Sequence, residues 1–198
     1  MKNNFDIVRI GANWVKDVLL INNFDLDKIA FIRPSISQEF WDLYTNKKPY
    51  IFEGKHFYKG NNINLLFWGR LVRSKGMNVM RKSIKLLSKH NYTFHIVGDI
   101  NNGDLSFKKL YSENKNNNKI IFHGSLDHKS IFKLGLKCDI ALIPSSWFET
   151  GPITVFEAFA MNLPVIGTKL GGIEEICTHN FDSLLFELNN HKELANHI

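Results

Sequence analysis

The sequence contains little cysteine and proline, and no long apolar run: only 2 of its 198 residues are cysteine and 5 are proline. Cys138 and Cys177 lie far apart inside apolar stretches, which favours buried thiols in a reducing compartment over a disulfide or a metal site. Lys2, Asp6 and Arg9 interrupt the first residues, so we expect no signal peptide. No run approaches the ~18 apolar residues of a membrane-spanning helix, and the cytoplasm is the expected location.

Several well-known ligand motifs are also missing. There is no GxxxxGK[ST] loop for nucleoside triphosphates and no GxGxxG fingerprint for NAD or FAD. The sequence has no HExxH and no CxxC pair, so a metal-dependent mechanism lacks obvious ligands. We therefore expect neither a metal nor a resident cofactor.

The net charge is modestly positive, at +6 from 25 Lys and Arg against 19 Asp and Glu. These cations are scattered and form no block of five or more, so nucleic acid is not expected as a partner. A phosphate-rich ligand or an anionic membrane surface remains compatible with the excess. A hydrophobic content of 44% and a charged content of 22% are typical of a globular chain with a core.

From Ile63 onward, short apolar runs alternate with helical patterns. Such alternation, with each strand a nearly continuous apolar run, indicates an α/β fold with a parallel sheet and helices on both faces. The expected strands are 63–68, 92–97, 119–122, 139–143, 164–167 and 184–186. The expected helices are 75–90, 105–114, one capped by Asp127, 152–161, and a short one opened by Gly171-Gly172.

The first 62 residues follow a different pattern. Apolar residues at helical spacing predict a helix over 10–23, and a short strand follows at 28–32. Residues 38–62 have many aromatics but little periodicity, which favours a connecting segment. We therefore divide the chain into a segment 1–62 and an α/β domain 63–198.

Ligands of parallel sheets bind beyond the carboxyl ends of the strands. There the sequence places Gly69-Arg70, Gly98-Asp99, His123-Gly124, Ser145-Ser146 and Thr168. Among the histidines, only His123 lies at such a strand end. We therefore expect these residues to share one edge of the sheet and to form the ligand site.

The stretch 144–172 carries the most specific pattern. Pro152 suits the first position of a helix, which leaves the amides of Ile153 and Thr154 free to face an anion. Glu149 and Glu157 flank this point with seven residues between them. Two carboxylates cannot bind the same anion, so we expect them to hold hydroxyl groups around it. A phosphate between sugar hydroxyls describes a nucleotide sugar.

The loop from Gly69 to Gly76 supplies the complementary charge. Arg70 and Lys75 lie between the first strand of the domain and its helix. A departing pyrophosphate needs such cations, because its negative charge grows as the bond breaks.

Together these motifs resemble the donor domain of glycosyltransferase family 4, also called group 1 glycosyltransferases. The likeness covers about residues 63–187 and rests on the order and spacing of several short motifs. They are Gly69-Arg70 with Lys75-Gly76, Phe122-His123-Gly124, Pro144-Ser145, Glu149-x7-Glu157-Ala158, Pro164-Val165-Ile166 and Gly171-Gly172-Ile173-Glu174-Glu175. Residues 10–35 are similar to the helix and strand that close the family's N-terminal domain.

The resemblance implies one half of a GT-B fold and a metal-independent, retaining hexosyltransferase that uses a UDP- or GDP-linked sugar. Arg70, Lys75 and Glu149 would be the catalytic residues, with Glu149 on the transferred sugar. Glu157 would bind the ribose, and the backbone at His123 and Gly124 would meet the base. The remaining donor-binding positions would be Gly69, Gly98, Gly151, Pro152, Ile153, Thr154, Gly171 and Gly172.

The sequence departs from the family pattern at Glu149-Thr150-Gly151-Pro152, where Glu-x-Phe-Gly is common, and at Ile100, where glycine is common. Most of the acceptor domain and the helix that returns to it are also missing. Three explanations stay open: a fragment of a full enzyme, one half of a split transferase with a separate acceptor-domain partner, or a non-catalytic nucleotide-sugar-binding module. The expected acceptor is a glycan or a lipid-linked glycan, in polysaccharide assembly in the cytoplasm or at the inner face of the membrane.

Overall fold

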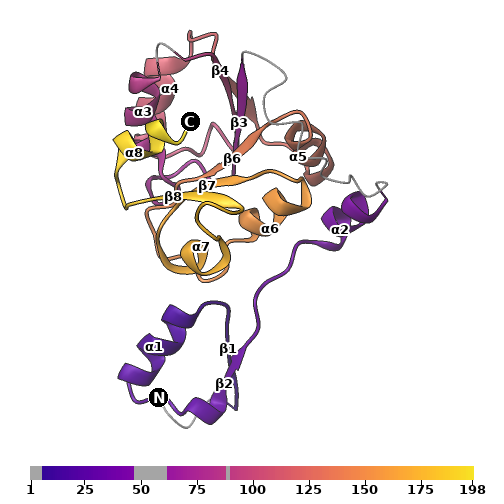
Figure 1. The fold of residues 1–198 in the computed structure, drawn as a ribbon, viewed down its shortest axis with the longest axis vertical. Coiled ribbons are helices and arrows are strands. Elements are labelled where there is room, and N and C mark those ends of the chain that lie inside the picture. Colours follow the sequence, from indigo (N-terminus) through magenta and orange to yellow (C-terminus); the bar gives the residue numbers. More distant parts are fainter. Residues whose placement is uncertain (1–5, 47–61, 88–89) are drawn as a thin grey trace.

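The structure of the protein is a computed structural model that describes residues 6–46, 62–87 and 90–198. Its largest feature is a six-stranded sheet in which every neighbouring pair of strands is parallel (Figure 1). The strands are β3 (Ile63–Trp68), β4 (Tyr92–Val97), β5 (Ile120–Gly124), β6 (Ile140–Ile143), β7 (Val165–Thr168) and β8 (Ser183–Phe186). The prediction of a parallel α/β sheet is confirmed.

The order of the strands fixes where a ligand can bind. They run β5-β4-β3-β6-β7-β8 across the sheet, so the chain starts in the centre, builds outward on one side and then crosses back to the other. This is the doubly wound order of Rossmann folds, whose ligands lie in the crevice beyond the strands where the direction reverses. Here that point lies between the carboxyl ends of β3 and β6.

Helices cover both faces of this sheet, as predicted. One face packs against α3 (Met77–Leu86), α4 (Leu105–Asn114) and α8 (His191–Asn196). The other packs against α5 (His128–Gly135) and α6 (Ile153–Ala160), with α7 (Gly171–Ile176) on the same side. Burial of apolar side chains on both faces explains why the strands are nearly continuous apolar runs.

Several boundaries differ from the predicted ones. β5 extends to Gly124, so His123 and Gly124 are its last residues and do not follow it. Pro152 is the N-cap of α6 and not its first helical residue, because its ψ of 96° is extended. The helix predicted from residue 75 begins at Met77, after a 3₁₀ turn (Arg73–Lys75), because Gly76 has a φ of +85° that an α-helix cannot contain.

The sequence analysis did not predict α8. The side chain of Asn190 accepts a hydrogen bond from the backbone N–H of Glu193, and the Glu193 carboxylate accepts one from the Asn190 side chain. A cap residue followed three positions later by glutamate is a known helix-start signal. Leu194 is buried on the side of α3, so this short helix completes the core.

The N-terminal part forms a second, smaller sheet. Strand β1 (Val8–Ile10) pairs in parallel with β2 (Ile29–Phe31), and α1 (Asn13–Ile21) and a 3₁₀ turn (Leu26–Lys28) connect them. The helix predicted over 10–23 is therefore wrong at its start, where the chain forms a strand. We call residues 8–31 the N-terminal unit; it lies apart from the six-stranded sheet (Figure 1).

A further helix, α2 (Gln38–Thr45), lies where the sequence predicted only a connecting segment. Ser37 caps it by accepting from the N–H of Phe40, and Phe40 is fully buried against Phe132 of α5, with ring centroids 5.0 Å apart. One aromatic contact to a distant helix thus stabilises a helix that its own periodicity hardly indicates. The rest of the predicted segment, 47–61, lies outside the described residues.

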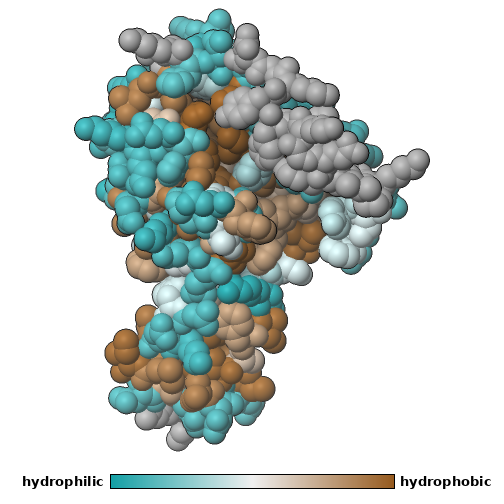
Figure 2. All heavy atoms as spheres, in the orientation of Figure 1, coloured by the Kyte–Doolittle hydropathy of each residue, from teal (hydrophilic) through white to brown (hydrophobic). Residues whose placement is uncertain are grey.

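The surface of the N-terminal unit is rich in apolar side chains (Figure 2). Ile21 is 80% exposed, and Val18 and Phe31 are about half exposed. Helix α1 has no buried residue at all. Parallel sheets are normally covered on both faces, so a two-stranded parallel sheet with one helix that has no fully buried residue is an incomplete layer.

Candidate functional site

An ion pair marks the point where the strand order reverses. The Nζ of Lys75, which follows β3, lies 2.6 Å from Oε1 of Glu149, which follows β6. The same carboxylate oxygen accepts a hydrogen bond of 2.8 Å from the Ser145 hydroxyl. The structure therefore brings together two residues that are 74 positions apart in the chain, at the crevice where ligands of this fold bind.

Gly69 and Arg70 directly follow β3. The Arg70 side chain is exposed and has no ion pair with the described residues. Gly69 has a φ of +139°, and a side chain added there would meet no atom within 4 Å. The carboxyl end of β3 is therefore followed by an open stretch of backbone and an exposed cation.

The N-terminus of α6 points its first amides toward the same edge. Pro152 provides no side-chain cap, and the amides of Ile153 and Thr154 have no carbonyl one turn earlier to accept their hydrogens. Ile153 is 42% exposed. Gly151 lies so close to Pro34 that a side chain at Gly151 would overlap the proline ring. The start of α6 therefore has free amide donors that can face an anion.

Glu157 lies deeper than Glu149. It is 7% exposed, and its Oε2 accepts a hydrogen bond of 2.6 Å from Nε1 of Trp68, the last residue of β3. The Glu157 carboxylate is therefore near the same end of β3 as Gly69 and Arg70. Lys75 with Glu149, and Glu157 with Trp68, therefore lie at the carboxyl edge of the sheet.

His123 is paired with a second histidine. Its Nε2 lies 2.9 Å from Nδ1 of His95 on β4, and the two rings stack with centroids 5.2 Å apart. Burial lowers the pKa of His95, and the nearby charge of His123 lowers it further; burial also lowers the pKa of His123. Gly124, next to this pair, has a φ of +71°, and a Cβ added there would meet no atom within 4 Å.

The other predicted glycines, Gly98, Gly171 and Gly172, pack closely against neighbouring loops of the chain. A side chain at Gly98 would overlap the Gly69 carbonyl, so this glycine lets the ends of β3 and β4 approach each other. Gly172 donates its N–H to the Glu149 carbonyl at 2.8 Å, and Gly171, with a φ of +54°, contacts Phe148. These three glycines shape the loops around the site.

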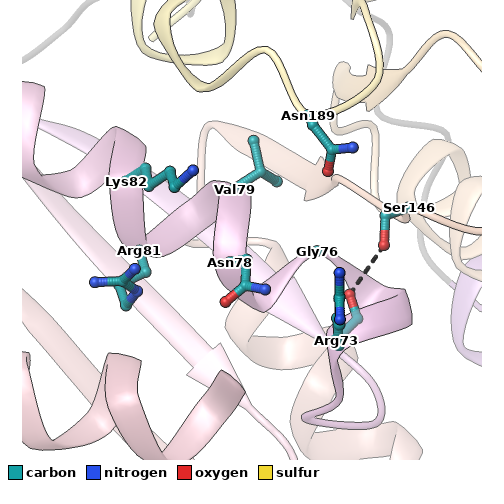
Figure 3. Close-up of a pocket in the computed structure, with 8 residues that line it drawn as sticks. All are labelled: Arg73, Gly76, Asn78, Val79, Arg81, Lys82, Ser146 and Asn189. Atoms are coloured by element: carbon teal, nitrogen blue, oxygen red, sulfur yellow. Dashed lines mark hydrogen bonds between the residues drawn. The ribbon is translucent and has the colours of Figure 1, made fainter. Parts of the chain in front are cut away.

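A pocket of about 400 Å³ adjoins the site on the α3 side (Figure 3). Its side chains come from α3 and its preceding turn, from the loop after β6 and from the loop after β8. Ser146 donates to the backbone carbonyl of Arg73 at 3.0 Å and so holds two of these loops together. The lining residues are Arg73, Gly76, Asn78, Val79, Arg81, Lys82, Ser146 and Asn189.

The sequence patterns do not predict the side chains that contact Glu149, Glu157 and His123. They place Ser145 at a strand end without linking it to Glu149, and they place Trp68 and His95 only within strands. His95 could have been found from strand alternation, because it faces the side opposite to the core residues Phe94 and Ile96. No local signal links Trp68 to Glu157, which are 89 positions apart.

The described residues contain neither a metal-binding cluster nor a membrane-spanning helix. Within residues 6–46, 62–87 and 90–198, no cluster of three or more His, Cys, Asp or Glu side chains has the geometry to bind a metal. In the same part of the chain, no helix combines the length and the apolar character needed to cross a bilayer.

Comparison with known proteins places this geometry in a family. A solved glycosyltransferase from Rickettsia africae is 29% identical, with a TM-score of 0.78 over 96% of this chain and 52% of its own. HepE from Anabaena, solved with UDP-glucose, is 17% identical, with a TM-score of 0.73 over 98% of this chain and 53% of its own. An uncharacterised 41.2 kDa protein in the cps region of Klebsiella pneumoniae is 30% identical over 123 residues, or 62% of this chain and 32% of that protein.

The chain thus spans about half the length of these solved structures. The family described as "Glycosyl transferases group 1" matches residues 51–198, which include every strand and helix of the six-stranded sheet. The fold is that of GT-B glycosyltransferases, and this chain belongs to the group 1 glycosyltransferase family.

Proposed function

We propose that the chain is the donor half of a retaining family 4 glycosyltransferase. It transfers a hexose from a UDP- or GDP-linked sugar to a glycan or lipid-linked acceptor without a metal. The observation that carries the proposal is the 2.6 Å contact between Lys75 and Glu149 at the reversal of strand order. A cation and a carboxylate at this point suit a ligand that carries phosphate beside hydroxyl groups.

The roles follow from chemistry and position. Lys75 and Arg70 neutralise the diphosphate, whose charge grows as the sugar leaves. The amides of Ile153 and Thr154 donate to the same phosphates from the start of α6. Glu149, oriented by Ser145, accepts hydrogen bonds from hydroxyls of the sugar. The leaving phosphate oxygen takes the acceptor's proton as the acceptor attacks from the same face, which gives retention.

Glu157 and the end of β5 hold the nucleoside. One oxygen of Glu157 is occupied by Trp68, and the other is the acceptor we assign to a ribose hydroxyl. The open backbone at Gly124 gives the base room beside His123. HepE, solved with UDP-glucose, supports a donor of this class, because it shares the fold of this chain.

Calorimetric titration of the chain with UDP, GDP, UDP-glucose and GDP-mannose tests whether the site binds a nucleotide sugar. We expect Arg70→Ala and Lys75→Met each to weaken binding about tenfold or more, because each removes a charged hydrogen bond to phosphate. Lys137→Met is the matched control and should leave binding unchanged, because Lys137 is exposed, precedes β6 and does not line the pocket. If none of the four nucleotides binds, or if Lys137→Met lowers binding as much, the proposal fails.

A second candidate is a non-catalytic donor-binding module or the subunit of a split transferase. The incomplete parallel layer of the N-terminal unit favours it, because exposed residues such as Ile21 and Phe31 suit contact with further strands and helices. A separate acceptor-domain protein would supply them. Donor binding without transfer, and transfer restored by such a partner, would distinguish this candidate from the first.

We further propose that the protein works in the cytoplasm, including the inner face of the membrane, in polysaccharide assembly. Cys138 and Cys177 are both free and buried, as in proteins of reducing compartments. The Klebsiella relative in the cps region supports a role of this class. Fractionation of cells that express a tagged chain would test the location.

A further inference from the structure

The backbone of residues 149–151 lies between α7 and the N-terminal unit. The Glu149 carbonyl accepts two hydrogen bonds, one of 2.8 Å from the N–H of Gly172 and one of 3.0 Å from the indole Nε1 of Trp14 on α1. The Trp14 ring also packs on Phe148, with centroids 5.3 Å apart. Both lone pairs of this carbonyl are therefore used, and the peptide group next to the Glu149 side chain has a fixed orientation.

Close packing extends this contact along the loop. A side chain at Gly11 would overlap the carbonyl of Thr150, and one at Gly151 would overlap Pro34, which follows β2. Three consecutive residues of the loop thus contact the turn before α1, α1 itself or the segment after β2. Any shift of these elements must move the loop or open a gap beside it.

Glu175 attaches α1 to α7. The N-cap residue of α1 is Ala12, which has no side-chain acceptor. The Glu175 carboxylate provides the cap instead, with 2.8 Å to the N–H of Asn13 and 3.0 Å to that of Trp14. Arg33 lies 3.5 Å from the same carboxylate. A residue 161 positions away from Trp14 therefore caps this helix, where most helices use a local residue.

We propose that Trp14 and Glu175 are positioning residues for Glu149. They hold the loop so that the Glu149 carboxylate stays against Lys75 and Ser145 and faces the transferred sugar. The role of Glu149 toward sugar rests on the proposed function; the positioning of the loop does not. Neither residue touches the ligand, and both act through the Glu149 backbone.

The test separates positioning from helix capping. Glu175→Ala removes both the cap and the connection to α7. Adding Ala12→Ser restores a local cap, because residue 12 already has extended backbone and serine is a favoured N-cap. Ala12→Ser alone shows whether the buried site accepts the hydroxyl. Trp14→Phe keeps an aromatic ring next to Phe148 and removes the indole N–H donor together with one ring of the indole.

Two measurements decide the inference. Hydrogen exchange of the ligand-free chain should be about tenfold faster over 147–153 in Trp14→Phe and in Glu175→Ala/Ala12→Ser, with α1 as protected as in the unsubstituted chain. The affinity for UDP-glucose should fall in both variants, while that for UDP changes by less than about twofold, because only the sugar meets Glu149.

Unchanged exchange over 147–153 in both variants would overturn the inference, and so would full recovery of exchange and sugar affinity in Glu175→Ala/Ala12→Ser. Failure of the unsubstituted chain to bind any UDP or GDP ligand is a different outcome. It would reject the proposed function, and the exchange measurement would still decide the positioning role.

Discussion

Charged side chains at the carboxyl edge of the sheet are mostly held before any ligand arrives. Lys75 and Ser145 hold Glu149, and Trp68 holds Glu157. Such partners fix the side-chain geometry, so a ligand that exchanges for them meets groups already in place. Arg70 is the exposed exception.

The histidine pair gives a pH dependence of stability. The pKa of His95 and of His123 is lower in the folded chain than the ordinary value of about 6.5, so the unfolded chain binds more protons between the folded and unfolded values. Above about pH 6.5 the pair therefore does not lower the free energy of unfolding. Below that value the free energy of unfolding falls as the pH is lowered. We expect His95→Gln to make this fall shallower in urea unfolding measured between about pH 5 and 8.

The control for this prediction is His90→Gln, which changes an exposed histidine outside the pair. It should keep the slope of the unsubstituted chain. Equal slopes for His95→Gln and the unsubstituted chain would mean that the pair does not set the acid sensitivity.

At the scale of elements, short helices depend on their caps and on one or two buried contacts. α8 has six residues, too few to be stable in isolation. Asn190 caps its start, Leu194 is buried, and the Ser83 hydroxyl on α3 donates to the His191 carbonyl at 2.9 Å. Contacts with α3 therefore stabilise α8 in the fold.

Asn190→Ala removes the cap and should lower the free energy of unfolding by about 1 kcal/mol, the usual cost of losing an N-cap. Urea denaturation would measure it. Asn196→Ala, at an exposed position in the same helix, should be neutral or slightly stabilising because alanine favours helix. A loss of equal size in both variants would point to a general effect on α8.

At the scale of the whole molecule, the two sheets differ in how much core they have. The six-stranded sheet has two apolar clusters, one on each face. Within the N-terminal unit, only Ile10 and Ala12 are buried. Local opening free energies follow buried contacts, so the two parts should not open together.

We expect amides of residues 8–31 to exchange at least about tenfold faster than those of β3, β4 and β6 under native conditions. Mass-spectrometric hydrogen exchange of the intact chain would measure this. Addition of a partner that completes the small sheet should slow exchange in residues 8–31 first. Uniform protection across both sheets would show that the N-terminal unit is stabilised as part of a single cooperative core.

The sequence by itself determined the parallel sheet, the helices on both faces and the edge at which Arg70, Lys75, Glu149 and Glu157 gather. These follow from local patterns, since apolar runs, glycines at strand ends and a proline at a helix start act within a few residues. The boundary errors at β1, α3 and β5 have the same origin, because strand and helix ends are set by weak local preferences.

Only the tertiary structure decided which side chains meet. The ion pair of Lys75 with Glu149, the bond from Trp68 to Glu157 and the cap that Glu175 places on α1 join residues 74 to 162 positions apart. No short-range pattern encodes such contacts, since they depend on the strand order and on close packing at glycines such as Gly11. For the same reason the sequence did not predict α2, which is stabilised by burial of Phe40 against α5.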